Sequence, residues 1–309
     1  MNTFKKDVLL GLSESPRWLP CKYLYDAKGS DLFEKICDTD DYYVTRADLE
    51  IHEHQISEIA QLIGPNAHLI EFGSGSGIKT ELLLSSLRAP RAYTPIEISK
   101  TALDASVTQL RQRFKSLEVQ PLQADYTEDI DPSHLTLEPS AQRRVIYFPG
   151  STIGNFTHDQ ARAFLARMRK MAGSGGLIFV GVDLIKPVNK LLLAYDDKAG
   201  ITAEFNKNLL QRIQTELNGR LDLSAFEHES RFNHELQRVE MHLVAQRSTR
   251  IEVDDHVFEF DRGESIHTES SHKYSIEDFQ TLAKDSGLNP MRFWLDGHAQ
   301  FSMHCLEPV

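Results

Sequence analysis

The sequence predicts an α/β fold, with helices on both faces of a mostly parallel sheet and a second domain of the α+β type. Short apolar runs alternate with amphipathic stretches through the middle of the 309-residue chain. A glycine-rich run directly follows the first of these apolar segments. Strand–helix alternation of this kind favours parallel strands covered on both sides.

The expected strands are short and apolar, and each is followed by a polar or glycine-containing turn. They cover residues 68–72, 92–98, 119–124, 144–148 and 177–182. The helices expected between them cover residues 78–87, 99–115 and 158–171. Ligands of such sheets bind beyond the carboxyl ends of the strands, so the residues that follow each strand are candidates for a site.

Two regions lie outside this alternation. Residues 30–36 and 46–62 have helical patterning, as do residues 201–217, whereas 239–244, 249–253 and 257–260 resemble strands. Residues 291–306 have strand character around the turn Asp296-Gly297, which predicts an antiparallel hairpin that completes the sheet. We therefore expect a sheet domain of residues 62–194 and 273–309. Residues 1–61 and 195–272 would form the second domain.

Composition narrows the class of function. The formal net charge of -11 disfavours a nucleic-acid partner, and no apolar run approaches the roughly 20 residues of a membrane helix. The three cysteines have no CxxC spacing, and the N-terminus lacks a secretory signal. The histidine-containing stretches 50–54 and 298–304 offer no convincing ligand set, so we expect solvated faces there and no metal. We predict a cytoplasmic, monomeric enzyme that acts on a small molecule, without nucleic-acid or membrane partners.

The glycine-rich run LIEFGSGSG at residues 69–77 indicates which cofactor the sheet binds. Gly73, Gly75 and Gly77 permit a tight turn and a close approach of ligand to backbone. Ile78 follows the turn where a dinucleotide pattern needs its last glycine. Glu71 lies two residues before the first glycine, and its carboxylate would disfavour the binding of a negatively charged pyrophosphate. The spacing therefore favours S-adenosylmethionine over a nicotinamide cofactor.

Residues at the next strand ends fit the same cofactor. Glu97 could accept hydrogen bonds from ribose hydroxyls, although nicotinamide enzymes also have an acid at this point. Asp125 and Tyr126 could bind the adenine amino group and cover its ring. A nicotinamide-dependent oxidoreductase and a non-catalytic S-adenosylmethionine-binding module stay open as alternatives on these residues alone.

Longer motifs give a more specific indication. The run YFPGSTIGNF at residues 147–156 resembles a signature of the histidine-specific, S-adenosylmethionine-dependent methyltransferases of ergothioneine biosynthesis. Further motifs that resemble this family lie at residues 25–33, 42–46, 195–206, 239–241 and 266–274. The resemblance covers nearly the whole chain. It implies a Rossmann-like class I methyltransferase sheet and a second, α+β substrate-binding domain.

The resemblance also implies an activity. Members of the family would transfer methyl groups from S-adenosylmethionine to the α-amino group of L-histidine and give the trimethylated product hercynine. The alternative within the family is an N-methyltransferase for another amino acid or a histidine derivative. Glu269 and Ser271 are both present here, which favours histidine.

Site residues follow from the resemblance position by position. The implied cofactor-binding residues are Tyr25, Gly73, Gly75, Lys79, Glu97, Asp125 and Tyr126. The implied substrate-binding residues are Tyr42, Asn155, Tyr195, Met241, Glu269 and Ser271. Asn155 would accept a hydrogen bond from the α-amino group and, with Tyr25, forms the expected catalytic pair. Tyr42 and Tyr195 would bind the α-carboxylate, while Glu269 and Ser271 would hold the imidazole nitrogens beside Met241.

Overall fold

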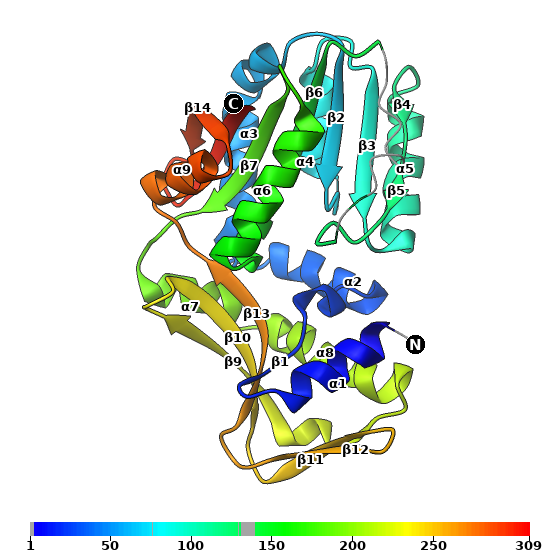
Figure 1. Cartoon of the computed structure of the whole chain (residues 1–309), viewed down its shortest axis with the longest axis vertical. Helices are drawn as coiled ribbons and strands as arrows, with labels where there is room; N and C mark the ends of the chain where they lie inside the picture. The colour runs from blue at the N-terminus through cyan, green and yellow to red at the C-terminus, as the bar shows by residue number, and fades with distance from the viewer. Residues whose placement is uncertain (1–2, 76, 129, 131–139) are drawn as a thin grey trace. The chain divides into compact units, whose positions relative to one another are not determined.

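A computed structural model describes residues 3–75, 77–128, 130 and 140–309 of the chain (Figure 1). Its contacts divide the chain into two units. Residues Val44–Ile185 and Lys273–Val309 form one, which we call the sheet unit, and Met1–Tyr43 with Lys186–His272 form the other, which we call the second unit.

These boundaries differ from the expected ones at two places. Helix α3 (Tyr43–Ile63), expected in the second domain, belongs almost entirely to the sheet unit. It is held there by polar contacts, because His52 bonds to Tyr147 of a central strand and the carbonyl of Leu62 accepts from Arg143. Helix α7 (Val188–Tyr195) belongs to the second unit instead of the sheet domain.

The sheet unit is built on one mixed sheet with the strand order β14-β15-β7-β6-β2-β3-β4, in which β5 also pairs with β3. Its strands are β2 (Ala67–Phe72), β3 (Ala92–Glu97), β4 (Glu118–Val119), β5 (Leu122–Gln123), β6 (Arg143–Phe148), β7 (Leu177–Asp183), β14 (Leu288–Leu295) and β15 (Phe301–Pro308). The strands β2 to β7 are parallel, whereas β15 is antiparallel to both β7 and β14. The order reverses between β2 and β6, and this arrangement confirms the predicted Rossmann-like fold class.

Helices follow the strands of this sheet, as expected. They are α4 (Ile78–Ser86), α5 (Lys100–Arg113), the short η3 (Thr152–Asn155), α6 (His158–Ala172) and α9 (Ile276–Asp285). Helix α6 begins at a capping box in which Thr157 and Gln160 satisfy each other's backbone N–H groups. Its apolar side packs into a core with Phe72 and Phe148 from the sheet.

One predicted strand of the sheet differs from the structure, and the predicted C-terminal hairpin agrees with it. The expected strand 119–124 is two short strands, because Pro121 between them has no N–H to donate. The expected C-terminal hairpin is confirmed, and Asp296 caps its turn by accepting from the N–H groups of Gln300 and Phe301.

The second unit has the predicted α+β composition. A four-stranded sheet has the order β1-β13-β10-β9 and a three-stranded sheet the order β12-β11-β8. These strands are β1 (Arg17–Trp18), β8 (Arg220–Leu221), β9 (Phe226–Asn233), β10 (Arg238–Ala245), β11 (Thr249–Val253), β12 (His256–Phe260) and β13 (Ser265–His272). Besides α7, the helices are α1 (Thr3–Ser13), η1 (Cys21–Leu24), α2 (Ala27–Cys37), α8 (Ile201–Glu216) and η4 (Leu223–Ala225).

One face of the four-stranded sheet is covered by α7 and α8. Ser230 of β9 donates to the carbonyl of Leu192 in α7, and His228 contacts both the Tyr195 carbonyl and Asn206 of α8. We call this the helix-covered face and the other the opposite face.

Within the described residues, none of the helices combines the length and apolar character needed to cross a membrane.

Candidate active site

The glycine turn after β2 has the geometry that its sequence predicts. Gly73, Gly75 and Gly77 have φ angles of 72°, 47° and 74°, a region that favours glycine. A Cβ atom on Gly75 would meet nothing within 4 Å, and one on Gly73 would contact only the Tyr126 ring, at 3.7 Å. The turn therefore needs glycine for its backbone conformation, and its outer side is open. Ser76 of this run lies outside the described residues.

Glu71, which precedes the turn, is a core residue. It is 1% exposed and accepts hydrogen bonds from the hydroxyls of Thr80 in α4 and Tyr93 in β3. Burial raises the pKa of this carboxyl to about 7, against the opposing effect of the two hydroxyls. Glu71 thus fastens the helix and the neighbouring strand to β2 beneath the turn.

The ends of β3 and β5 lie beside the turn. Glu97 accepts from the N–H of Ser99 at 3.1 Å and from the backbone of Gly75, so the carboxylate fastens the glycine turn. Burial raises the pKa of Glu97, and these backbone N–H groups oppose the rise. Asp125 accepts from the N–H and hydroxyl of Thr127. The Tyr126 ring contacts Phe72 with 5.9 Å between ring centroids and lies over Gly73.

Lys79 is held by a buried acid from helix α3. Its Nζ lies 2.5 Å from Oδ2 of Asp48, and the same oxygen accepts from the N–H of Gly150 at 2.9 Å. Burial alone would raise the pKa of Asp48, but Lys79 and His52 outweigh it and hold that pKa well below its usual range. The ion pair therefore fixes the Lys79 ammonium against the turn that follows β6.

The contacts of Asp48 continue into the core through a histidine. His52 Nδ1 lies 2.7 Å from the carbonyl of Asp48, which can only accept, so this nitrogen carries the proton. Nε2 forms a second hydrogen bond, with the Tyr147 hydroxyl at 2.6 Å. The expectation of solvated histidines at 50–54 and 298–304 is wrong for His52 and His304, which are buried. Among the described residues, no three His, Cys, Asp or Glu side chains gather as a metal site requires.

Asn155 lies at the end of η3, in a turn that begins with Gly150 at φ 77° and Ser151 at φ 61°. The Ser151 hydroxyl accepts from the N–H of Asp183, at the end of β7, at 2.8 Å. Asp183 forms an ion pair with Lys273 at 2.8 Å, and both side chains are fully buried. A buried pair thus anchors the strand end to which the Asn155 turn is tied.

The second unit brings together the other expected substrate residues. The hydroxyls of Tyr195 and Ser271 are 2.7 Å apart, and the Tyr42 ring meets the Tyr195 ring edge-on at 6.1 Å. Glu269 pairs with Met241 across β13 and β10, and both are buried. Burial raises the pKa of Tyr42 well above its usual value, and the nearby Glu269 carboxylate adds to the rise. Tyr42 is therefore a neutral donor.

Tyr25 lies in the second unit among aromatic rings. Its centroid is 5.5 Å from that of Phe33 and 5.4 Å from that of Phe205, both edge-on, and Phe33 also meets Tyr42. The structure thus assigns Tyr25 to the unit of the expected substrate residues, while the other expected cofactor residues and Asn155 belong to the sheet unit.

The comparison with known families decides the identity. A model of the histidine-specific, S-adenosylmethionine-dependent methyltransferases matches residues 4–308. The chain belongs to this family. The predicted methyltransferase activity and S-adenosylmethionine cofactor are thereby confirmed.

Two relatives from mycobacteria cover almost the full length of both proteins. The histidine N-alpha-methyltransferase of Mycobacterium tuberculosis is 35% identical over 304 residues, which cover 97% of this chain and 93% of the relative. The enzyme of the same name from Mycolicibacterium smegmatis is 34% identical with the same coverage. Ergothioneine biosynthesis protein 1 of Neurospora crassa is 30% identical, and the match covers 95% of this chain but 33% of that protein.

Several residues around the site were not predicted for this methyltransferase. Phe33 and Ser151 lie within motifs 25–33 and 147–156, which resemble the family, so the sequence indicated their neighbourhood but not their contacts. Nothing in the sequence indicated that Asp48 and His52 contact the site residues, because an acid and a histidine four residues apart on a helix more often face solvent. Only the burial of this side of α3 shows that they belong to the network of Lys79.

Proposed function

We propose that this methyltransferase trimethylates the α-amino nitrogen of L-histidine to give hercynine, with the sheet unit holding the cofactor and the second unit holding the amino acid. The observation that carries the proposal is the buried group of Glu269, Ser271 and Tyr195 in the second unit. The names of the family and of its mycobacterial members support the same substrate.

The imidazole ring of histidine matches this group chemically. A carboxylate only accepts hydrogen bonds, so Glu269 would accept from a ring N–H. The Ser271 hydroxyl can donate or accept, so it would serve the other ring nitrogen. Met241, opposite Glu269, would contact the ring plane as a flexible apolar side chain.

The α-carboxylate of histidine needs hydrogen-bond donors from the protein. The hydroxyls of Tyr42 and Tyr195 would supply them, since the raised pKa of Tyr42 keeps its proton in place. Neutral donors bind a carboxylate without adding a full positive charge next to the α-amino group. A cation of the protein at this position would repel the positive charge that develops on the nitrogen during methylation.

The sheet unit offers groups that suit S-adenosylmethionine. Glu97 would accept from ribose hydroxyls, Asp125 would accept from the adenine amino group, and the ring of Tyr126 would cover the adenine. Lys79, fixed by Asp48, would bind the cofactor's carboxylate. The open side of Gly73 and Gly75 leaves room for close contact with backbone. When bound, the cofactor supplies an electrophilic methyl group on a sulfonium.

Methyl transfer requires a neutral amine held in line with the methyl group. The amide oxygen of Asn155 would accept from an N–H of the substrate and leave the nitrogen lone pair directed at the methyl. Asn155 cannot act as a base, so the proton would leave through water or the hydroxyl of Tyr25. Rings such as Phe33 and Phe205 would attract a methylated ammonium by about 0.5–2 kcal/mol each.

We also propose that the enzyme acts as a monomer in the cytoplasm. All three cysteines are free thiols, as is usual in a reducing compartment. Sedimentation velocity of the purified protein tests the monomer directly.

The substrate is tested by incubating the enzyme with S-adenosylmethionine and each of the twenty amino acids, followed by mass spectrometry. We expect products with one, two and three added methyl groups from histidine. Methylation of another amino acid in place of histidine would overturn the proposal.

The role of Glu269 is tested by Glu269→Ala. A hydrogen bond to a charged group contributes about 1.5–3 kcal/mol, so KM for histidine should rise about 10- to 100-fold. The dissociation constant of S-adenosylmethionine should stay unchanged. Glu259→Ala, at an exposed position of β12, is the matched control. An equal loss of cofactor affinity in Glu269→Ala would remove this residue from the substrate site.

A further inference from the structure

Strand β13 changes its register against β10 among the expected substrate residues. Residues 265–267 pair with 242–244, and residues 269–272 pair with 238–241. Thr268 falls between the two sets and has no residue opposite it. An extra residue on one strand of an antiparallel pair is a β-bulge, a feature that re-aims neighbouring side chains.

The bulge decides which side chains of β13 lie on the helix-covered face. Side chains alternate between faces along a strand. On β10, Met241 pairs with Ser230, which contacts α7, so Met241 lies on the helix-covered face while Glu240 and His242 lie on the opposite one. Since Glu269 pairs with Met241, it shares that face. Ser271, two residues further on, shares it too, and its contact with Tyr195 of α7 agrees.

A regular strand through the same sequence would give the reverse result. Thr268 would then pair with Met241, and Glu269 would lie opposite Glu240 on the other face. A change of register by one residue moves every following side chain to the other side of a sheet. It would also place two carboxylates directly across from each other, which is destabilising.

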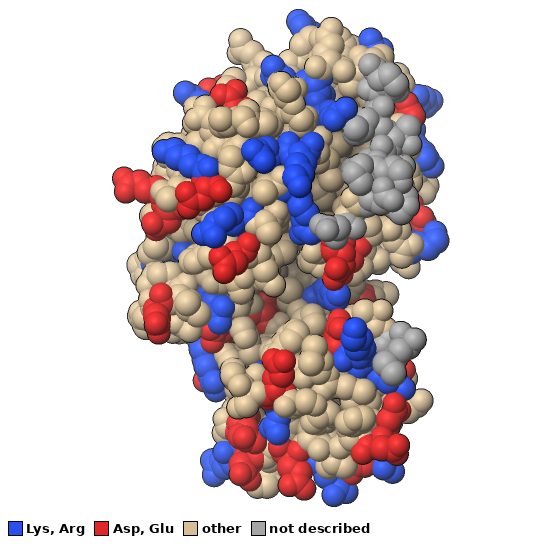
Figure 2. Space-filling model, in the orientation of Figure 1, with Lys and Arg blue, Asp and Glu red and all other residues tan. Residues whose placement is uncertain are grey.

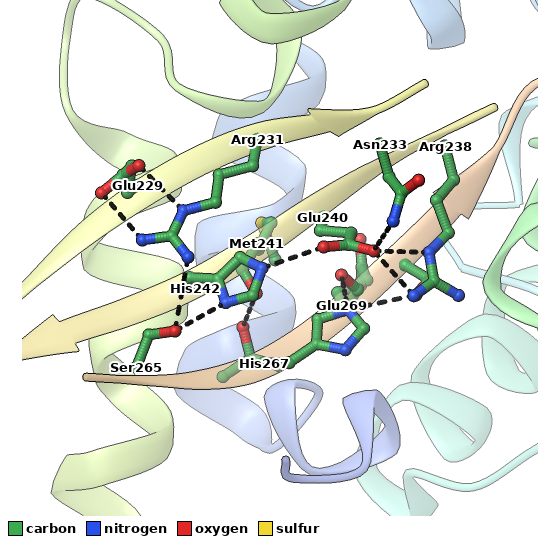
Figure 3. Close-up of polar contacts among 12 residues, drawn as sticks. Glu229, Arg231, Asn233, Arg238, Glu240, Met241, His242, Ser265, His267 and Glu269 are labelled. Carbon is green, nitrogen blue, oxygen red and sulfur yellow. Dashed lines mark hydrogen bonds and ion pairs between the residues drawn. The ribbon is translucent and has the colours of Figure 1, made fainter. Parts of the chain in front are cut away.

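Two side chains hold the bulge in place. The buried hydroxyl of Thr268 donates to the carbonyl of Met241 at 3.1 Å. His267 Nε2 lies 2.9 Å from the carbonyl of Glu269, so this nitrogen is the donor (Figure 3). One residue thus fixes the strand opposite the bulge, and the other fixes the backbone of Glu269 itself.

His267 is in turn held by a polar network on the opposite face. Its ring stacks on that of His242, with 5.1 Å between centroids (Figure 3). His242 contacts Glu240 at 3.2 Å and Ser265 at 3.1 Å, and Arg238 pairs with Glu240 at 2.7 Å. Burial lowers the pKa of both histidines, that of His242 to about 4, so both rings are neutral near pH 7.

We propose that Thr268 and His267 are positioning residues for substrate recognition. By holding the bulge, they direct the Glu269 carboxylate to the helix-covered face and so select an amino acid whose side-chain ring has an N–H donor. The inference rests on the proposed function, because it takes Glu269 as the group that contacts the ring.

The test replaces the hydroxyl of Thr268 and measures histidine and cofactor separately. Thr268→Val keeps the branched shape and removes the donor, so KM for histidine should rise about tenfold, as expected for one displaced hydrogen bond. The turnover number and the dissociation constant of S-adenosylmethionine should change less than twofold. Thr268→Ser keeps the hydroxyl and should restore the wild-type KM. Thr281→Val, which removes a similar hydroxyl-to-carbonyl bond in α9, is the control.

A double variant separates positioning from a general structural role. If Thr268 acts through Glu269, then Thr268→Val should have no further effect on KM for histidine in the Glu269→Ala background. Equal tenfold losses in both backgrounds would overturn the proposal. His267→Phe retains the ring and loses the donor, and should reproduce the KM effect if Thr268→Val fails to fold. Unchanged KM in both single variants would also overturn it.

The outcome is distinguishable from failure of the proposed function. If Glu269→Ala leaves histidine KM unchanged, the assignment of Glu269 to the substrate is wrong. If Glu269→Ala weakens histidine binding while the Thr268 and His267 variants do not, only the role of the bulge is wrong.

Discussion

The two units position their expected site residues in different ways. In the sheet unit, the residues follow the carboxyl ends of β2, β3, β5 and β6, where the direction of parallel strands already determines their location. In the second unit, Tyr42, Tyr195 and Glu269 come from a loop, a helix and a strand face. Packing and strand register bring them together.

The anchoring chemistry differs as well. Lys79 and the turn of Asn155 depend on buried charges, through Asp48 and through the pair of Asp183 with Lys273. Tyr195 depends on a neutral hydrogen bond and on aromatic contacts. Buried charges are costly when one partner is lost, whereas neutral bonds contribute less and do not respond to pH near neutrality. The contrast predicts that the sheet unit is the more sensitive of the two to changes of charge.

The largest expected effect comes from Lys273→Met. Removing one partner of a buried ion pair leaves the Asp183 carboxylate uncompensated and should lower the free energy of unfolding by about 3–5 kcal/mol. Denaturant titration measures it. Lys100→Met breaks an exposed pair with Asp104 and should cost less than about 0.5 kcal/mol. A loss in Lys273→Met as small as that in Lys100→Met would contradict the dependence of the sheet unit on buried charges.

Glu71→Gln tests the charge sensitivity of the sheet unit through pH. The pKa of Glu71 is raised from 4.5 to about 7 in the folded state. Its contribution to stability is therefore complete below pH 4.5 and is lost as pH rises through 7, by about 3 kcal/mol in all. The neutral amide should remove this loss, so the difference in unfolding free energy between about pH 4.5 and pH 8 should shrink by that amount.

Equilibrium unfolding across this range measures the effect of Glu71→Gln. Glu118→Gln, on the exposed side of β4, is the control. A pH profile of Glu71→Gln that is parallel to the wild-type profile would contradict the assignment of this loss to Glu71.

The smallest effect is expected for Tyr195→Phe in the second unit. It removes the bond to Ser271 and should lower the free energy of unfolding by about 1 kcal/mol, with no dependence on pH between 5 and 8. Because the two hydroxyls share one bond, Tyr195→Phe and Ser271→Ala should cost less together than the sum of their separate losses. Strictly additive losses would show that the bond contributes nothing.

The same contrast explains what the sequence could predict. The strands of the central sheet are buried on both faces, so their apolar runs are visible, and the ends of those runs located the glycine turn and Glu97. Strands β9 and β13 have polar sequences, FEHESRFN and SIHTESSH, without the alternation that marks a strand. The expected site residues of the second unit were therefore found only through motif resemblance.

Contacts between residues far apart in the sequence could not be predicted either. No pattern within α3 indicates that Asp48 meets Lys79 or that His52 meets Tyr147, since partners separated by 31 and 95 positions are paired by tertiary packing alone. The bulge at Thr268 is equally invisible, because it depends on the register of β13 against β10.

The order of strands in the central sheet bears on how the chain folds as it is synthesised. Strand β7 pairs with β15, whose residues follow it by more than a hundred positions, after the whole of the Lys186–His272 segment has been made. Until then β7 has an open edge that another chain could pair with. The first 43 residues of the second unit are synthesised early, but its remaining segment, Lys186–His272, follows only after residues 44–185 of the sheet unit. Each unit is interrupted by the other in the sequence, so the sheet unit can be completed only after the whole of the second unit has been synthesised.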